Sequence, residues 1–188
     1  MFLKNLKSLD ELIENLQQLP TIGKKSATRM AMFLIKNKFI GMKIANSIES
    51  AITAIDECKE CGNLSENELC EICMSDRENK ICIVAHSKDI ILLEENDIFK
   101  GYYFVMPELD NDKIEKLIKL IKKKNINEII FGYTHSIENE AKILYLEERL
   151  KNQNLTFSKI AQGIPMGVNF ENVDITSLYK AFSGRIKI

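Results

Sequence analysis

The chain has 188 residues, of which 28% are charged and 45% are apolar, a balance that excludes a disordered or collagen-like protein. Its apolar runs are far too short to cross a bilayer, and residues 1–16 alternate charged and apolar side chains. We therefore expect a cytoplasmic protein with no secretory signal and no membrane partner. In that compartment the five cysteines are more typical of metal ligands or free thiols than of disulfides.

Charge is distributed unevenly along the chain. The whole sequence carries 26 basic and 27 acidic residues, whereas residues 1–50 carry eight basic and four acidic ones. The first fifty residues therefore have a net charge of +4, and the remainder has −5. This indicates that a polyanion would bind at the N-terminal part, although an asymmetry of this size also arises by chance.

The N-terminal third is predicted to form three short helices. Ser8-Leu9-Asp10-Glu11 has the form of a capping box, so the first helix is expected to have Ser8 as its N-cap and to end at Pro20. The second is expected to begin near Lys24, and Gly41 is expected to open the third. Both have apolar residues at helical spacing that are expected to point inward, namely Ala27, Met30, Ala31 and Leu34 in the second and Ile44, Ile48, Ala51, Ile52 and Ile55 in the third.

The turn between the first two helices has the features of a nucleic-acid contact. Leu19-Pro20-Thr21-Ile22-Gly23 resembles the turn of a helix-hairpin-helix DNA-binding motif, with Gly23 able to adopt positive φ. Unpaired N–H groups at the N-terminus of the second helix can bind a phosphate, and Lys24, Lys25 and Arg29 add cationic contacts. Such contacts do not read bases, so DNA binding would be sequence-independent and salt-sensitive. The alternative is an ordinary helical hairpin with a solvated basic face.

The cysteines form the strongest local pattern. Cys58-Lys59-Glu60-Cys61 and Cys70-Glu71-Ile72-Cys73 are two C-x2-C pairs separated by eight residues, and Gly62 permits the tight turn after the first pair. Four thiolates suit one tetrahedral Zn²⁺, and a site filled by four protein ligands would be structural. A redox motif or an iron–sulfur cluster is the alternative. Cys82 lies outside the pattern and is expected to be a buried strand residue.

The C-terminal half alternates short apolar segments with amphipathic ones, which predicts a mixed or parallel sheet with helices packed on it. Strands are expected at Ile81–Val84, Ile90–Leu93, Gly101–Met106, Asn127–Gly132 and Leu155–Ala161. Helices are expected at Lys113–Lys124, Glu138–Leu150 and Asp174–Phe182. The sequence has no Walker A motif and no G-x-G-x-x-G, and neither histidine lies beside an obvious nucleophile.

Taken in order, these parts resemble the bacterial RecR family of recombination mediators over about residues 8–185. Four stretches carry the resemblance, namely Leu19–Ala31 with its hairpin turn, Cys58–Cys73 with Gly62-Asn63-Leu64, Ile81–Gly101 as the start of a Toprim domain, and Ile160–Gly167 with Glu171, Asp174 and the Ser177–Arg185 helix. Their combination is far more specific than the cysteine spacing alone.

The resemblance implies a multi-part α+β fold. Its expected parts are a helical helix-hairpin-helix DNA-binding region at 1–56, a zinc finger with four cysteine ligands at 57–79, an α/β Toprim-like domain at 80–165, and a C-terminal segment and helix at 166–188. It also implies a non-enzymatic protein of recombinational DNA repair that forms a ring-shaped homotetramer, a homodimer being the smaller alternative. Such proteins act with RecO, and in many bacteria with RecF, to place RecA on single-stranded DNA.

Several site residues follow from the resemblance. Lys24 and Arg29, with Lys25 next, match the family's DNA contacts. Cys58, Cys61, Cys70 and Cys73 match the ligands of one structural zinc ion. Glu138 and Glu140 match acidic Toprim positions linked to contact with the RecO partner.

The chain also departs from the Toprim pattern. Toprim enzymes hold Mg²⁺ with an acidic residue after the first strand and a D-x-D pair after a later one, whereas this chain has Ala85-His86 and Gly132-Tyr133-Thr134-His135. Gln162 replaces a usual Arg, and Asn139 replaces a Gly between the two glutamates. The stretch Met106–Leu109 lacks a loop rich in glycine and proline, so the Toprim rim is expected to differ.

Two other functions are also compatible with the sequence. A magnesium-dependent Toprim nuclease or primase-related enzyme would need an acidic cluster built from Glu94, Glu138, Glu140 or Asp174. A zinc-stabilised interaction module without DNA binding would be consistent with the near-neutral net charge.

Overall fold

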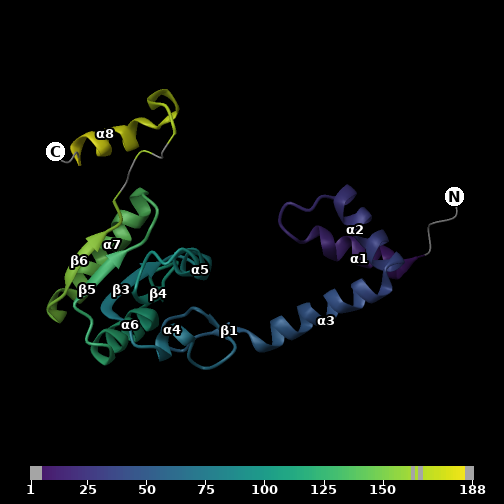
Figure 1. Ribbon diagram of the computed structural model, residues 1–188, viewed down its shortest axis with the longest axis horizontal. Coiled ribbons are helices and arrows are strands. Elements are labelled where there is room, and N and C mark those ends of the chain that lie inside the picture. Colours follow the sequence, from purple (N-terminus) through teal and green to yellow (C-terminus); the bar gives the residue numbers. More distant parts are fainter. Residues whose placement is uncertain (1–5, 162–163, 165–166, 185–188) are drawn as a thin grey trace. The chain divides into compact units, whose positions relative to one another are not determined.

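The computed structural model describes residues 6–161, 164 and 167–184, which divide into two units, Met1–Ile55 and Asp56–Ile188 (Figure 1). The first unit is helical, and the second contains the cysteine cluster and the sheet. No helix among the described residues is both long enough and apolar enough to span a membrane.

Three helices make up the first unit, as the sequence predicted. They are α1 (Lys7–Gln17), α2 (Lys24–Lys36) and α3 (Lys38–Ala54). The predicted capping box at Ser8 is wrong, because α1 begins earlier than expected and Ser8 lies inside it. The Leu6 carbonyl accepts hydrogen bonds from the amides of Leu9 and Asp10 at 2.9 and 3.1 Å, so Leu6 is the N-cap.

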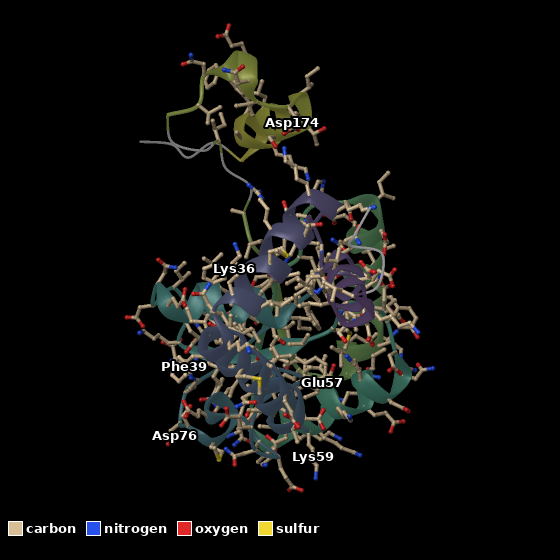
Figure 2. The ribbon with its side chains drawn as sticks, turned by 90° about the vertical axis from the view of Figure 1, so that its right-hand side faces the viewer. Lys36, Phe39, Glu57, Lys59, Asp76 and Asp174 are labelled. Atoms are coloured by element: carbon tan, nitrogen blue, oxygen red, sulfur yellow. The ribbon has the colours of Figure 1, made fainter. Side chains whose placement is uncertain are left out.

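The prediction that the apolar side chains of α3 point inward is also wrong for a single chain. Ile44, Ile48 and Ile52 follow the predicted helical spacing, but they stay exposed, Ile52 at 77%. Phe39, in the first turn of α3, is 82% exposed (Figure 2). Gly41 does not open the helix, since its amide already donates to the Asn37 carbonyl at 3.0 Å. Amphipathic spacing gave the helix correctly but did not identify what covers its apolar face.

Short elements form the segment that carries the cysteine pairs. β1 (Asp56–Glu57) pairs antiparallel with β2 (Leu64–Ser65), and α4 (Glu71–Met74) contains the last cysteine. Gly62 has φ +73°, which confirms the predicted need for glycine in the turn after the first cysteine pair.

A four-stranded parallel sheet forms the rest of the second unit, as the alternation of strands and helices predicted. Its order is β4-β3-β5-β6, with bounds β3 (Glu78–Val84), β4 (Gly101–Val105), β5 (Glu128–Phe131) and β6 (Thr156–Lys159). The helices are α5 (Ser87–Glu95), α6 (Asn111–Lys123), α7 (Ile137–Leu150) and α8 (Ile175–Ser183), with 3₁₀ turns at Lys151–Gln153 and Phe170–Asn172.

The predicted strand at Ile90–Leu93 is wrong, because these residues lie in α5. A run of four apolar residues fits either a buried strand or a helix. The helix prevails because His86 and Asp89 cap its start, the His86 amide donating to the Asp89 carboxylate at 3.1 Å. Only Ile90 of the run is fully buried, as expected for one face of a helix.

Helices cover both faces of the sheet, which explains why its strands are apolar on both sides. The larger core lies between one face and helices α6 and α7, and contains Ile81, Ile83, Tyr102, Phe104, Ile129, Phe131, Leu117 and Leu146. The smaller core lies on the other face, where Ile90 of α5 packs on Val84 and Tyr103. Cys82 lies in this second core and is 4% exposed, which confirms the prediction of a buried strand residue. Burial raises the pKa of its thiol to about 12.

Candidate nucleic-acid interface, zinc centre and acidic rim

The hairpin turn between α1 and α2 is built differently from the prediction at one position. Gly23 has φ −85° and serves as the N-cap of α2, its carbonyl accepting from the Ala27 amide at 3.0 Å. The positive φ of the turn belongs instead to Thr21, at +67°. Pro20 precedes this residue, and the Ile22 amide returns to the Leu19 carbonyl at 3.2 Å to close the turn. The turn geometry is therefore strained at a threonine, a position that residue preference alone does not identify.

The N-terminus of α2 is open to a ligand. No side chain caps it, and its first turn contains no acidic residue. Lys24, Lys25 and Arg29 are all exposed, and none of them forms an ion pair with another described residue. The opposite side of the helix buries Ala27 and Ala31 completely. The three cations therefore lie on the solvent side of a helix start whose dipole already favours a phosphate.

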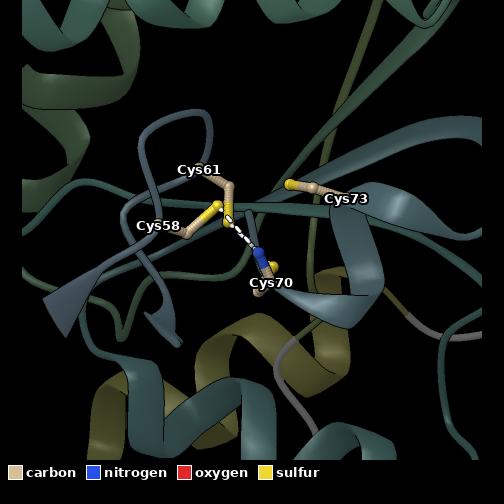
Figure 3. A group of neighbouring side chains, drawn as sticks. All are labelled: Cys58, Cys61, Cys70 and Cys73. Carbon is tan, nitrogen blue, oxygen red and sulfur yellow. Dashed lines mark hydrogen bonds between the residues drawn. The ribbon is translucent and has the colours of Figure 1, made fainter. Parts of the chain in front are cut away.

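The four cysteines of the C-x2-C pairs converge on one point (Figure 3). Their sulfur atoms all lie within 4.8 Å of one another, and all four side chains are buried. The Sγ atoms of Cys61 and Cys70 are 3.5 Å apart. Tetrahedral Zn²⁺ with Zn–S bonds of about 2.3 Å requires sulfur–sulfur distances of roughly 3.8 Å, so the cluster fits this ion.

The four thiols need a bound cation in order to ionise together. The contact between the two sulfurs lowers the pKa of Cys70 and raises that of Cys61, and Cys61 in turn raises the pKa of Cys73. Four adjacent thiolates cannot coexist without a positive charge at their centre. Backbone amides already support the set, since the Cys70 amide donates to Cys58 Sγ at 3.3 Å and the Asn63 amide to Cys61 Sγ at 3.5 Å. The site is therefore a closed, structural zinc centre with four cysteine ligands, as predicted.

The zinc centre is continuous with the sheet. The Val105 amide donates to the Cys61 carbonyl at 2.8 Å, and the Tyr102 hydroxyl donates to the Ser75 carbonyl at 3.1 Å. Lys124 donates to the Cys73 carbonyl at 2.8 Å and lies 4.7 Å from the centre of the Tyr102 ring. All four ligand cysteines belong to the larger core. A metal held by these cysteines would therefore be coupled to the sheet as well as to its own loop.

Glu138 and Glu140, the two glutamates predicted to contact a partner, lie in the first turn of α7 and are called the rim glutamates here. They differ in their surroundings. Glu138 forms an ion pair with Lys142 at 3.0 Å, and its side chain is 72% exposed. Glu140 accepts from Lys159 at 3.0 Å through both oxygens and from His135 Nδ1 at 2.9 Å through Oε1, and its side chain is 34% exposed. Lys159 lowers the pKa of Glu140.

Sequence reasoning missed the partners of these glutamates. Lys142 is predictable in principle, because it follows Glu138 by four residues on one helix. His135 and Lys159 come from a loop and a distant strand, and no sequence signal joins them to Glu140. Lys180 of α8 contacts His135 Nε2, which adds the C-terminal helix to this network.

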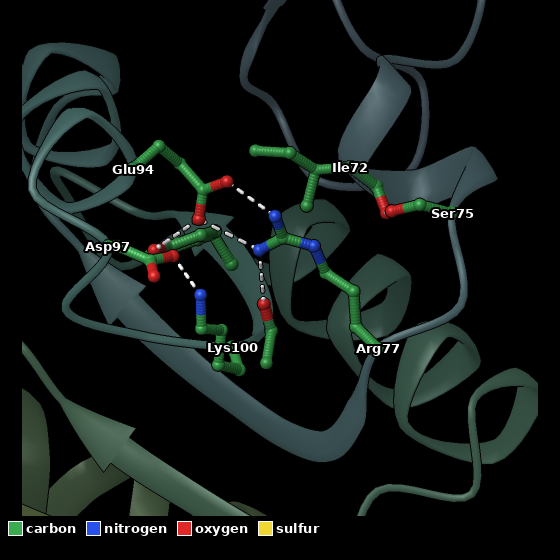
Figure 4. A network of polar contacts seen from close by, with 8 residues as sticks. Ile72, Ser75, Arg77, Glu94, Asp97 and Lys100 are labelled. Carbon is green, nitrogen blue, oxygen red and sulfur yellow. Dashed lines mark hydrogen bonds and ion pairs between the residues drawn. The ribbon is translucent and has the colours of Figure 1, made fainter.

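The acidic residues that a magnesium-dependent Toprim enzyme would need do not form one cluster, because each of them binds a different partner within the chain. Glu94 pairs with Arg77, with one oxygen 2.8 Å from the guanidinium, and accepts from the Tyr103 hydroxyl at 2.8 Å (Figure 4). Asp174 caps α8 by accepting from the Ser177 amide at 2.9 Å. Within the described part of the chain, the four cysteines are the sole cluster of cysteine, histidine and acidic side chains that could hold a metal ion.

The positions after β3 and β5, where the Toprim pattern has acidic metal ligands, have no carboxylates in this chain. Ala85 follows β3, and Gly132 follows β5 with its amide bound to the Ile83 carbonyl at 2.8 Å. A Cβ at Gly132 would lie 3.0 Å from Cys82 Sγ, so a carboxylate cannot replace this glycine without displacing the core. The Tyr133 hydroxyl donates to the Met106 carbonyl at 2.8 Å, and burial raises its pKa. Gln162 lies outside the described residues.

Comparison with known proteins gives a consistent result. Three family models match, a RecR helix-hairpin-helix over residues 9–52, a RecR zinc finger domain with four cysteines over 55–75 and a Toprim domain over 79–161. A recombination protein RecR of Campylobacter jejuni subsp. jejuni serotype O:23/36 is 54% identical over 188 residues, covering 98% of this chain and 99% of that protein. Recombination protein RecR of a Nitratiruptor species is 42% identical over 97% of this chain and 98% of the relative. The protein of that name from Helicobacter pylori is 41% identical over 94% and 93%.

Proposed function

Because this chain belongs to the RecR family of recombination proteins, we propose that it is a non-enzymatic, cytoplasmic DNA-binding protein of recombinational repair. In this role it acts with a RecO-type mediator, and with RecF where that protein is present, to help load RecA onto single-stranded DNA. The observation that carries the proposal is the exposed cluster of Lys24, Lys25 and Arg29 around the open N-terminus of α2.

These three residues act on the phosphate backbone. The helix start offers unpaired amides, and the cations beside it are not neutralised by described acidic groups. Contacts of this type hold a strand without reading its bases, so the protein would accept DNA of any sequence and lose affinity as salt rises. The remaining chain has a net charge of −5, which favours binding at the first fifty residues.

Assembly of several chains strengthens this binding. The first unit leaves an apolar hollow of about 530 Å³, lined by Leu16, Met30, Phe33, Leu34 and Ile44 together with Ser26 and Arg29. The apolar residues of α3 are exposed as well. An exposed surface of this kind is typical of protein–protein contacts. A homodimer or a ring-shaped homotetramer would cover the apolar residues of this surface. It would also bring two or four basic clusters together, which strengthens the positive electrostatic potential that one chain provides.

The second unit serves as a frame and a docking surface in this proposal. Zinc holds the frame together, and the rim acids Glu138 and Glu140 provide the contact for the RecO-type partner. Catalysis by a Toprim magnesium site is not supported, because Glu94, Glu138, Glu140 and Asp174 are engaged in separate ion pairs or caps. A hard divalent cation requires several oxygens at one point.

DNA binding by the zinc-loaded chain tests the main proposal. We expect wild-type protein to shift long duplex and single-stranded DNA at low salt. The double variant Lys24→Ala/Arg29→Ala should bind about tenfold more weakly, with an unchanged Tm, because both side chains are exposed. Lys43→Ala, which removes an exposed cation of α3, is the matched control. Wild-type affinity in the double variant would show that the hairpin is not the DNA contact.

A second assay tests the absence of catalysis. We expect no nicking or strand synthesis when the protein is incubated with DNA and Mg²⁺ over many equivalents of substrate. Multiple turnovers that disappear in Glu138→Gln would instead establish a Toprim enzyme.

A further inference from the structure

Lys142 is the one charged residue that is buried among the described residues. It lies in α7, and its side chain is only 10% exposed. Its ammonium is surrounded by three oxygens, the Pro107 carbonyl at 2.7 Å, Glu138 Oε1 at 3.0 Å and Glu108 Oε2 at 3.1 Å. An ammonium has three donors, so these contacts satisfy the buried charge completely.

The contacts of Lys142 join two segments of the rim. Pro107 and Glu108 lie between β4 and α6, whereas Glu138 lies in the first turn of α7. Both glutamate side chains are largely exposed, at 76% and 72%. A lysine anchored in the protein therefore fixes carboxylates that would otherwise rotate freely in solvent.

Glu138 and Glu140 differ in what they can still bind. Lys159 contacts both oxygens of Glu140, and His135 contacts one of them, which leaves that carboxylate committed within the chain. Glu138 uses only Oε1 in its ion pair, and its side chain is mostly in solvent. Of the two glutamates predicted to contact a partner, Glu138 is therefore the one whose second oxygen can accept a donor from another molecule, whereas Glu140 ties α7 to β6.

We propose that Lys142 is a positioning residue that holds Glu138 so that its free oxygen meets a lysine or arginine of the RecO-type partner. This inference rests on the proposed function, because it concerns the same rim. A carboxylate fixed before binding loses less side-chain freedom when the partner docks, and this preorganisation increases affinity.

Four variants test the positioning of Glu138. Lys142→Met removes the charge and keeps the side-chain volume, and Glu138→Gln keeps the shape of the acid without its charge. The double variant completes the cycle. Lys151→Met is the matched control, since Lys151 forms an exposed ion pair with Glu148 near the other end of α7. The readouts are the Kd for purified RecO-type mediator, the Kd for DNA and the Tm of each zinc-loaded protein.

We expect Lys142→Met and Glu138→Gln each to weaken mediator binding about tenfold, and the double variant to bind no worse than either single one. Such non-additivity shows that Lys142 acts through Glu138, which a purely structural role would not produce. Lys151→Met should bind within about twofold of wild type, and no variant should alter DNA affinity. The inference would be overturned if Lys142→Met bound the mediator with wild-type affinity while Glu138→Gln bound it weakly. It would also be overturned if the loss of affinity in the double variant equalled the product of the losses in the two single variants.

A measurement without any partner keeps the inference testable where Lys142→Met fails to fold. NMR titration of the Lys142 ammonium in wild type and Glu138→Gln reports the pair directly, because Glu138 raises the pKa of Lys142. We expect this pKa to fall in Glu138→Gln, and an unchanged value would overturn the positioning alone. Failure of the wild-type chain to bind the mediator would instead overturn the proposed function, and with it any role of Lys142 at a partner surface.

Discussion

The backbone amide of Val105 donates a hydrogen bond to the carbonyl of Cys61 at 2.8 Å. Val105 ends β4, an outer strand of the parallel sheet, and Cys61 is a ligand of the zinc centre. The zinc-binding loop thus occupies a hydrogen-bonding position at the edge of the sheet, where an exposed strand would otherwise invite pairing with another chain. This contact joins the cysteine site directly to the sheet.

Removal of zinc should therefore destabilise the sheet and not only its loop. We expect a strong chelator, or Cys70→Ser, to lower the Tm of the second unit by about 10 °C or more, with loss of near-ultraviolet dichroism from the core tyrosines. Elemental analysis of the untreated protein should give one zinc per chain. Cys82→Ser is the control, because this thiol is no ligand and its replacement should leave the metal content unchanged. Retention of the full Tm after complete metal removal would contradict the structural role.

The salt dependence of DNA binding should report the number of cations at the hairpin. Each phosphate contact contributes about 0.7–0.9 to the slope of log K against log salt concentration. We expect Lys24→Ala to reduce the slope by about one contact and Lys24→Ala/Arg29→Ala by about two, at every DNA sequence tested. Lys116→Ala, an exposed lysine of α6, should leave the slope unchanged. Equal slopes in all proteins would exclude the hairpin as the phosphate contact.

The ion pair between Glu94 and Arg77 should make the free energy of unfolding depend on pH in the acidic range. Arg77 lowers the pKa of Glu94 below its ordinary value of 4.5, so the ionised carboxylate is favoured in the folded state. The stabilisation is fully present above this ordinary value and is lost as pH falls through the lowered pKa. Both side chains are partly buried and make charge-assisted hydrogen bonds, so Glu94→Gln should cost about 2 kcal/mol at neutral pH.

Urea unfolding from neutral pH down to about pH 3 checks this expectation. The difference in free energy of unfolding between wild type and Glu94→Gln should shrink as pH falls below the ordinary glutamate pKa of 4.5. Glu115→Gln, which alters an exposed carboxylate of α6, should show no such convergence. A difference that stays constant across the range would show that the ion pair does not contribute.

The exposed face of α3 should determine the association of chains. Ile52 is 77% exposed, so Ile52→Glu is not expected to unfold a single chain. We expect it to shift the mass measured by light scattering toward the monomer and to weaken DNA binding in parallel. Ser50→Glu places the same charge on the opposite side of α3 and should leave the mass unchanged. A multimer of unaltered mass in Ile52→Glu would show that chains associate elsewhere.

Most of the fold could be predicted from the sequence, because its helices and strands have clear hydrophobic periods. Ile90–Leu93 failed because four apolar residues carry no period, and the His86–Asp89 cap that decides for a helix is not a common residue pair. The positive φ predicted for Gly23 belongs to Thr21, because Pro20 and Thr21 are the central residues of the turn that the Ile22–Leu19 hydrogen bond closes.

The candidate site was predictable where its residues are close in sequence. The two cysteine pairs indicate their metal through spacing, and the basic residues Lys24, Lys25 and Arg29 are neighbours near the start of one helix. The rim was only half predictable. Its acids are close together in α7, but the cations that distinguish Glu138 from Glu140 come from α7, β6 and the loop before α7, and only the fold brings them together.

The crowding of the four ligand thiols has a redox consequence. Sulfurs within 4.8 Å of one another need only a two-electron oxidant and small movements to become disulfides, and Cys61 and Cys70 already lie 3.5 Å apart. A bound ion keeps these thiolates occupied and slows their oxidation. Protein stripped of its ion in air would thus become locked in an oxidised form, and adding zinc back would restore it only after a reductant.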